Sequence, residues 1–327
     1  MTTSISGTGG ITFPDGSVQP AAASPYVNKN RIINGDFRID QRNAGASVTA
    51  AVGYTYSVDR FAGYAAVASK FTMQQSTTAP TGFVNSALMT SSAATTPAAS
   101  DAYGFLQRIE GYNISDLGWG TANAKTITIS FWVRSSITGT YAVTITNSYA
   151  RCYPAEYTIS VANTWEQKSV TIAGDTSGTW LTTNGIGAEL WFDLGSGSTF
   201  YGTANSWNGS LKVRTSSSSN WIGTNGATFY ITGVQLEIGT SATPFERRLY
   251  NQELANCQRY YQTSIVSLSN STTDTWYGVW AYKVSLRAAP TVAGYGAGFV
   301  AGNNTTEILL AYQTTAARPL LTASSEL

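Results

Sequence analysis

Residues 225–261 constrain the fold of this chain more than any other stretch, because a strand, a sharp break and then a helical pattern follow one another there. The apolar residues of the strand alternate with polar ones and are Phe229, Ile231, Val234, Leu236 and Ile238. The alternation slips by one residue at Thr232-Gly233, which predicts a β-bulge at the glycine. Residues 239–244 then end the strand. The stretch therefore predicts where one β domain closes and another begins.

A helix is predicted within about residues 247–262, where four residues form one apolar stripe. They are Tyr250, Leu254, Cys257 and Tyr261. Thr243-Pro244-Phe245-Glu246 has the spacing of a capping box with proline at the first helical position, and a start nearer Tyr250 is the alternative that we prefer. The stripe either packs on the helix's own domain or forms a seam between three copies at a three-fold axis. It is too short to indicate a coiled coil.

Short apolar alternations fill residues 31–240, with Gly, Asn and Ser turns between them. The clearest strands are residues 126–134, 141–147, 157–161, 167–172, 188–193 and 228–238. Strands at this spacing, without helical stretches between them, predict an antiparallel sandwich. Residues 174–185 and 195–225 are polar and are predicted to form long loops at its edge, where binding sites usually lie.

The two ends of the chain predict smaller units. In residues 1–30, two short apolar runs flank Pro14-Asp15-Gly16, which has the composition of a turn. Residues 263–327 predict a small β domain that is too short to bury much surface alone, so a partner subunit is expected to complete its core. The predicted plan is a segment over residues 1–30, a sandwich over 31–240, a connecting helix over 241–262 and a β domain over 263–327.

The composition excludes several kinds of function. The net charge is +1 and only 11% of residues are charged, against roughly 25% in an average soluble protein. We therefore expect no nucleic-acid binding. No run approaches the roughly 20 apolar residues of a membrane span, so insertion into a membrane is not expected either. The chain has no histidine, so an enzyme of this sequence would depend on carboxylates. No acidic pair has a spacing that forces proximity, and turn or surface charges are the favoured interpretation of Asp40, Asp59, Asp101, Glu110 and Glu189, together with Arg60.

Cysteine usage indicates the compartment of synthesis. Cys152 and Cys257 lie far apart in the sequence, and we expect both to be buried free thiols made in a reducing cytoplasm. Residues 1–10 lack the basic and apolar regions of a signal peptide, so none is predicted.

Aromatic residues make up 12% of the chain and include 9 Trp and 19 Tyr. Sugars stack their C–H faces on aromatic rings and pair their hydroxyls with short polar side chains, so rings within polar loops are candidate glycan-binding residues. The candidates are Trp207, Trp221, Tyr201, Trp180, Tyr149 and Arg151. Core or loop packing is the alternative for each ring. Trp132 and Trp165 lie inside strand motifs and are expected in the core.

The strand motifs at residues 32–37, 129–133, 163–166 and 229–237 resemble those of carbohydrate-binding-module jelly rolls. Residues 10–19, 242–261 and 283–292 (KVSLRAAPTV) resemble bacteriophage and prophage tail-fibre proteins. The resemblance spans about residues 31–290 and is specific for the family rather than for a ligand. It implies a mainly β fold: an antiparallel jelly-roll β-sandwich followed by a short helix and a small C-terminal β domain.

The same resemblance implies a non-enzymatic receptor-binding protein of the virion tail, trimeric and assembled in the host cytoplasm. It would bind host cell-surface polysaccharide and dock to other tail or virion proteins through residues 1–30, unless that segment is a frayed terminus. A glycan depolymerase or its carbohydrate-binding appendage is one alternative, and a structural virion adaptor or decoration protein is another. Release of saccharide on incubation with host capsular polysaccharide would support the first of these.

Family jelly rolls often hold a structural calcium ion, whose first ligand here would be Asp36. The second acid of the family is replaced by Thr232-Gly233, which halves the charge that calcium favours. Calcium is therefore in doubt, and we expect Asp36 to bond the backbone or an arginine such as Arg38. No other cofactor is expected.

Overall fold

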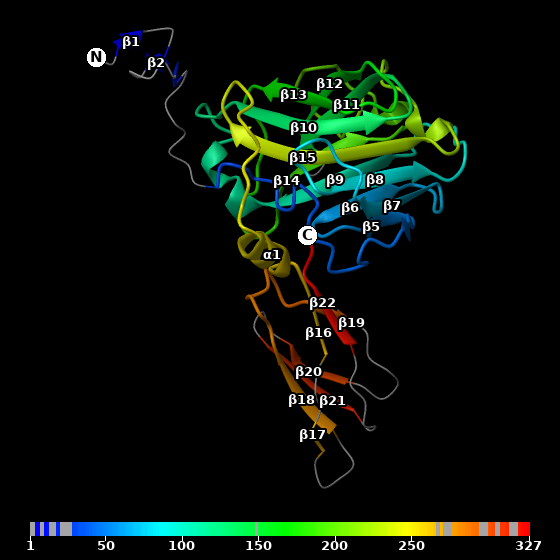
Figure 1. Ribbon diagram of the computed structural model, residues 1–327, viewed down its shortest axis with the longest axis vertical. Helices are drawn as coiled ribbons and strands as arrows, with labels where there is room; N and C mark the ends of the chain where they lie inside the picture. Colours follow the sequence, from blue (N-terminus) through cyan, green and yellow to red (C-terminus); the bar gives the residue numbers. More distant parts are fainter. Residues whose placement is uncertain are drawn as a thin grey trace.

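The computed structural model of the protein describes residues 4–6, 10–12, 18–19, 28–147, 150–265, 269–270, 276–293, 300–304, 308–313 and 320–327. Only the backbone is described before residue 28, within residues 264–279 and 300–313, and at residue 320. Two six-stranded antiparallel sheets pack face to face and form the body of the molecule (Figure 1). Within the described ranges, no helix is long and apolar enough to cross a membrane.

The first sheet has the strand order β13-β10-β15-β8-β7-β4. Its strands are β4 (Val48–Thr49), β7 (Phe71–Ser76), β8 (Ser86–Ser91), β10 (Ile127–Ser135), β13 (Glu166–Ile172) and β15 (Thr228–Ile238). The second sheet has the order β12-β11-β14-β9-β6-β5. Its strands are β5 (Gly53–Tyr56), β6 (Phe61–Ala65), β9 (Tyr103–Glu110), β11 (Gly139–Thr146), β12 (Cys152–Ile159) and β14 (Ile186–Asp193). The predicted mainly β, antiparallel jelly-roll fold is confirmed.

Alternating side chains of β15 build the core between the sheets. Phe229, Ile231 and Val234 are fully buried, and each such side chain contributes about 1.5–3 kcal/mol relative to an exposed one. The register of β10 on β15 shifts between Ser130 and Trp132, and Gly233 has a φ of +62°. The predicted bulge is therefore confirmed, and it keeps apolar residues facing the core on both sides of the phase slip.

The prediction that Trp132 and Trp165 belong to the core is wrong. Phe131 takes the core position of β10, and strand alternation turns Trp132 to the outer face, where it is only partly buried. Trp165 is also partly buried, and its ring contacts that of Tyr230 with centroids 6.0 Å apart. Both rings cover the outer surface of the first sheet.

The connection from β15 leads to α1 (Tyr250–Gln258), so the preferred helix start is confirmed and the capping box is wrong. The Glu246 carboxylate instead accepts the backbone N–H groups of Asn28 and Asn30, at 2.8 and 2.9 Å. The Thr243 hydroxyl donates to Glu237 Oε2 at 2.7 Å. These bonds tie the connection to the sandwich rather than to the helix.

The predicted stripe is not one continuous helical face, because the helix ends at Gln258 and Tyr261 begins the next strand. Cys257 is fully buried and Tyr261 is 8% exposed, both against their own chain, while Tyr250 is 50% exposed and Leu254 is partly buried. This burial favours packing on the helix's own domain. A seam between three copies stays a prediction.

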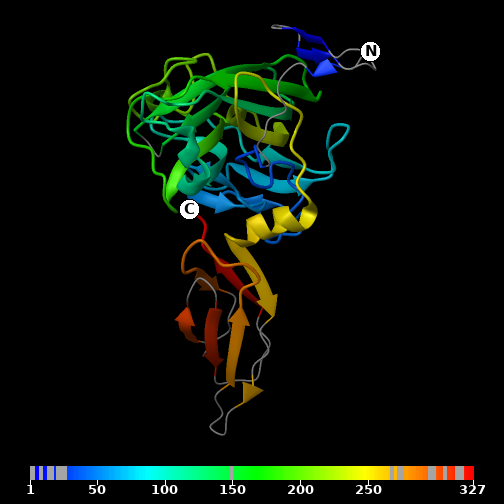
Figure 2. The same ribbon diagram turned by 90° about the vertical axis from the view of Figure 1, so that its left-hand side faces the viewer.

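The C-terminal strands form two small antiparallel sheets that extend away from the sandwich beyond α1 (Figures 1 and 2). One sheet has the order β16-β22-β19 and contains β16 (Tyr261–Ile265), β19 (Thr291–Ala293) and β22 (Leu320–Ser324). The other has the order β17-β18-β21-β20 and contains β17 (Ser269–Asn270), β18 (Trp276–Ala281), β20 (Val300–Asn304) and β21 (Ile308–Gln313). The chain then returns to the sandwich, where its last residues lie.

The N-terminal strands β1 (Ser4–Ser6), β2 (Gly10–Thr12) and β3 (Val18–Gln19) form an antiparallel sheet of their own. Ile11 pairs with Gln19 across the predicted turn, whose residues lie outside the described ones.

Both cysteines are buried and free, as predicted. Burial raises the pKa of the Cys257 thiol well above its usual range.

Candidate functional site

The predicted long loop between β14 and β15 builds the candidate site at one end of the sandwich. It contains two 3-10 turns, η3 (Ser198–Phe200) and η4 (Trp221–Gly223). The Gly197 N–H donates to Asp101 O at 2.7 Å, and the Thr199 N–H donates to Ala99 O at 2.9 Å. The loop is thereby held against the segment that enters β9.

A cavity of about 330 Å³ lies between these segments, and we call it the Tyr201 pocket. It is lined by Thr96, Pro97, Ala99, Ser196, Gly197, Ser198, Tyr201, Arg214 and Asn220. Tyr201 is 36% exposed, so this predicted candidate offers an accessible ring. Its backbone pairs with that of Arg214 in a parallel bridge, and the Arg214 Cζ atom lies 5.2 Å from the ring centroid.

Arg214 lines the Tyr201 pocket and is paired with the buried Asp193. Arg214 is 3% exposed, donates from Nη1 to Ser196 O at 2.9 Å, and also donates to Ser218 O. Its Nε atom lies 3.6 Å from Asp193 Oδ2. Burial raises the pKa of Asp193 to about 6, although Arg214 and the hydrogen bonds from Ser196 lower it. At neutral pH the arginine that lines the pocket is therefore paired with a carboxylate.

One wall of the pocket requires a glycine. A Cβ atom on Gly197 would lie 1.9 Å from the carbonyl oxygen of Ala98. This approach brings the loop close enough to segment 95–101 for the backbone bonds that close the pocket.

Trp221 is fully buried, so its prediction as an exposed stacking ring is wrong. Its ring packs beside Phe229 with centroids 6.5 Å apart. It covers the end of the core between the sheets and anchors η4 there. Composition suggested a polar loop throughout, but the loop must also close the core at this end.

Trp180, Trp207 and Arg151 meet in a second place, together with Trp119, which the sequence reasoning missed. The Trp119 and Trp180 centroids are 4.5 Å apart, and those of Trp180 and Trp207 are 5.7 Å apart. Trp180 is 7% exposed, so it is a core ring and not a stacking platform. Trp119 lies between two glycines outside any strand pattern, and that position was the one available signal.

Trp207 and Arg151 are held inside this tryptophan cluster. Trp207 is partly buried and donates its indole N–H to Ala173 O at 2.9 Å. Arg151 donates from Nε and Nη2 to the two oxygens of Asp175, each at 2.7 Å. The polar groups of Trp207 and Arg151 are therefore used in bonds within the protein, whereas the Tyr201 ring lines a cavity. Tyr149, the remaining candidate, lies outside the described residues.

Asp36 pairs with Arg38, whose Nε atom lies 2.5 Å from Asp36 Oδ2. Burial raises the pKa of the Asp36 carboxyl, while Arg38 lowers it. In the part of the chain that the structure describes, no group of three or more acidic or cysteine side chains lies close enough to hold a metal. The surroundings of Asp36 therefore do not fit a calcium site.

The other acidic candidates bind partners inside the fold. Glu110 accepts from Arg259 Nη2 and from the Tyr260 hydroxyl, both at 2.7 Å. Glu189 accepts from Arg108 Nε at 2.7 Å. The backbone N–H of Gln41 donates to Asp59 Oδ2 at 2.6 Å. Asp40 and Asp101 accept backbone N–H groups of their own turns. Each of these carboxylates therefore has a structural role.

No protein-family model and no curated protein matches this chain. Among solved structures, the enzymatically active domain of tailspike protein 4 from bacteriophage CBA120 is similar to it at 13% identity and a TM-score of 0.33, over 64% of this chain and 22% of that one. A family 11 carbohydrate-binding module from Clostridium thermocellum is similar at 13% identity and a TM-score of 0.29, over 59% of this chain and 100% of the module. A galactotriose-bound module, TmCBM61, is similar at 8% identity and a TM-score of 0.30, over 64% of this chain and 99% of the module.

Proposed function

We propose that this chain binds a host-surface glycan without altering it, as a receptor-binding protein of a bacteriophage tail fibre. The observation that carries this proposal is the Tyr201 pocket, where an accessible ring lies beside hydroxyl, amide and guanidinium groups. Its volume of about 330 Å³ is within the range of ligand-binding clefts.

The chemistry of the pocket suits a saccharide. The Tyr201 ring offers a face to the C–H groups of a sugar, a contact of about 1 kcal/mol by analogy with other aromatic pairs. Among the described residues, the Thr96 and Ser198 hydroxyls have no hydrogen-bond partner, so they can pair with sugar hydroxyls. Arg214 is already paired with Asp193, and this favours a neutral sugar unit over an acidic one.

The assembly that we propose is a homotrimer in the virion tail, put together in the host cytoplasm and docked to other virion proteins through residues 1–30. Two features support it. The C-terminal unit over residues 263–327 is too short to bury much surface alone, so a neighbouring subunit would extend its core. A pocket with one stacking ring binds weakly, and three linked copies would raise the avidity of the assembly.

The function is tested with Tyr201→Ala and Tyr201→Phe, scored for adsorption to host cells and for melting temperature. We expect Tyr201→Ala to weaken adsorption about fivefold or more and Tyr201→Phe to retain most of it, with little change in melting temperature for either. Tyr112→Ala is the matched control, because Tyr112 is 59% exposed and lies outside the pocket. Equal adsorption by the parent and Tyr201→Ala would remove the pocket as the receptor site.

Two further outcomes distinguish the alternatives. Saccharide release from purified host polysaccharide would show a depolymerase. Failure of the intact protein to adsorb to any host cell would favour a structural virion protein.

The trimer is tested by native mass at micromolar concentration, where a monomer would contradict it. Tyr250→Asp is expected to dissociate a trimer that meets along α1 while leaving each subunit folded, because Tyr250 is 50% exposed in the single chain.

A further inference from the structure

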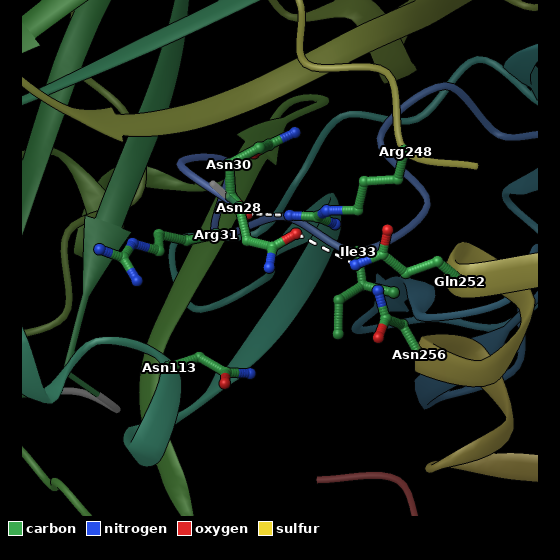
Figure 3. A pocket seen from close by; sticks show the side chains of 8 residues that line it. All are labelled: Asn28, Asn30, Arg31, Ile33, Asn113, Arg248, Gln252 and Asn256. Atoms are coloured by element: carbon green, nitrogen blue, oxygen red, sulfur yellow. Dashed lines mark hydrogen bonds between the residues drawn. The ribbon is translucent and has the colours of Figure 1, made fainter. Parts of the chain in front are cut away.

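A second cavity, of about 220 Å³, lies where the start of the sandwich, the 3-10 turn η1 (Gly111–Asn113) and helix α1 meet (Figure 3). We call it the junction pocket. It is lined by Asn28, Asn30, Arg31, Ile33, Asn113, Arg248, Gln252 and Asn256. The sequence reasoning singled out none of these residues, because they come from three segments far apart in the chain.

The charged side chains of the junction pocket are paired by the fold. Arg248 donates from Nη1 to Ile32 O at 3.0 Å, and the same atom lies 3.1 Å from Glu253 Oε2. The Arg31 Nη2 atom lies 2.6 Å from Asp116 Oδ2. The pocket therefore presents compensated charge to a ligand.

The amide side chains keep hydrogen-bonding groups that can take a ligand. In the described part of the chain, the Asn113 side chain makes no hydrogen bond, although it lines the pocket opposite α1 (Figure 3). Asn256 donates its amide N–H to Glu253 at 3.1 Å, and Gln252 donates to Asn28 Oδ1 at 3.1 Å. The carbonyl oxygens of Asn256 and Gln252 have no partner among the described residues.

We propose that the junction pocket binds an uncharged polyhydroxylated ligand, such as one neutral sugar unit. The amide groups of Asn113, Gln252 and Asn256 place donors and acceptors around one small cavity, and a hydroxyl group can satisfy both kinds. None of the eight lining residues is aromatic, so recognition rests on hydrogen bonds and not on stacking. The paired arginines give an acidic sugar no advantage over a neutral one.

This site is separate from the Tyr201 pocket. The two pockets share no lining residue. Asn220 of the Tyr201 pocket precedes β15, whereas Asn30 and Arg31 of the junction pocket bond the backbone of Val234 and Leu236 in the second half of that strand. Its ligand would contact both the sandwich and α1, so it would stabilise the join between them by binding the folded form alone. The two sites can therefore be tested independently.

The test uses the full chain carrying Tyr201→Ala, so that sugar binding at the Tyr201 pocket is weakened. The probes are glucose, galactose, mannose and N-acetylglucosamine, with galacturonate as the charged comparison, followed by saturation-transfer NMR and thermal melting. We expect at least one neutral sugar to bind in the millimolar range, and adding Asn113→Ala to weaken it about fivefold. Asn123→Ala is the matched control, because Asn123 is exposed and lies outside the pocket.

Asn256→Ala is a second variant with the same expected weakening. It also loses the bond to Glu253, so its melting temperature without sugar is measured first. Absence of any neutral-sugar response in the Tyr201→Ala background would overturn the proposal, as would equal binding by the Asn113→Ala and Asn123→Ala forms. Tighter binding of galacturonate would also overturn it. Loss of host-cell adsorption in Tyr201→Ala alone concerns the proposed receptor site and leaves these outcomes unaffected.

Discussion

The guanidinium of Arg60 pairs with the carboxylate of Glu326, which lies 266 residues further along the chain. Both side chains are almost fully buried, at 1% and 5% exposure. Arg42 donates from Nη2 to the same carboxylate at 2.7 Å. The end of the C-terminal unit is therefore fastened to the sandwich by one acid between two arginines.

We expect Glu326→Ala to lower the free energy of unfolding by about 3–5 kcal/mol, because it leaves the buried guanidinium of Arg60 without its partner. Chemical denaturation with the sandwich and the C-terminal unit probed separately measures the effect. Asp116→Ala, which removes a 41% exposed partner from Arg31, is the control and should cost about 1 kcal/mol or less. Equal effects of the two variants would show that the Glu326 pair contributes little.

The raised pKa of Asp59 leads to a prediction of how the free energy of unfolding depends on pH. Burial raises its pKa from 3.8 to about 6, although Arg42 and the hydrogen bonds from Gln41 lower it. The folded state therefore holds a proton that the unfolded state has released, and the stability from this group is lost as pH rises from about 4 to about 6. Relative to Asp59→Asn, the parent should lose up to about 3 kcal/mol over that range. Parallel denaturation curves at pH 4, 5, 6 and 7 check this, and a constant difference between the two proteins would contradict it.

Trp221→Ala should cost about 3–5 kcal/mol, because it removes a fully buried ring from the end of the core. Trp132→Ala should cost clearly less, since Trp132 lies on the outer face of its sheet and is partly buried. Melting temperatures of the two variants decide the order. A larger loss for Trp132→Ala would place that ring in the core after all.

Gly197→Ala tests the wall of the Tyr201 pocket. The added methyl group would lie 1.9 Å from Ala98 O, so the loop must move, at a cost of about 1–3 kcal/mol. Adsorption should fall together with stability. Gly209→Ala is the control, because nothing lies within 4 Å of its added Cβ, and it should leave both quantities unchanged.

Local patterns predicted the strands well, because alternation along a strand reports which face is buried. The slip at Thr232-Gly233 indicated the bulge in β15, which lies where the pattern placed it. The same alternation was misapplied to Trp132. Phe131 is the residue of this pair that alternates in phase with the buried positions of the strand. The large tryptophan ring was instead assigned to the core because of its size.

The binding surface was predicted only in part, because exposure depends on what the rest of the chain places above each ring. Polar loops of similar composition contain all four of the aromatic candidates Tyr201, Trp180, Trp207 and Trp221. Contacts from distant segments bury Trp221 entirely, enclose Trp180 in a cluster of rings and leave Tyr201 accessible. No local pattern separates these three environments.

The amino-acid order alone was enough to indicate a β-sandwich, its long loops, one helix and a second small β unit, since periodicity and turn chemistry are properties of neighbouring residues. The pairing of Arg60 with Glu326, and the placement of Asn113 and Asn256 around one cavity, arise only when the chain folds back on itself. Such contacts depend on strand order and on the direction in which each segment leaves the sheets, and both are set by packing across the whole molecule.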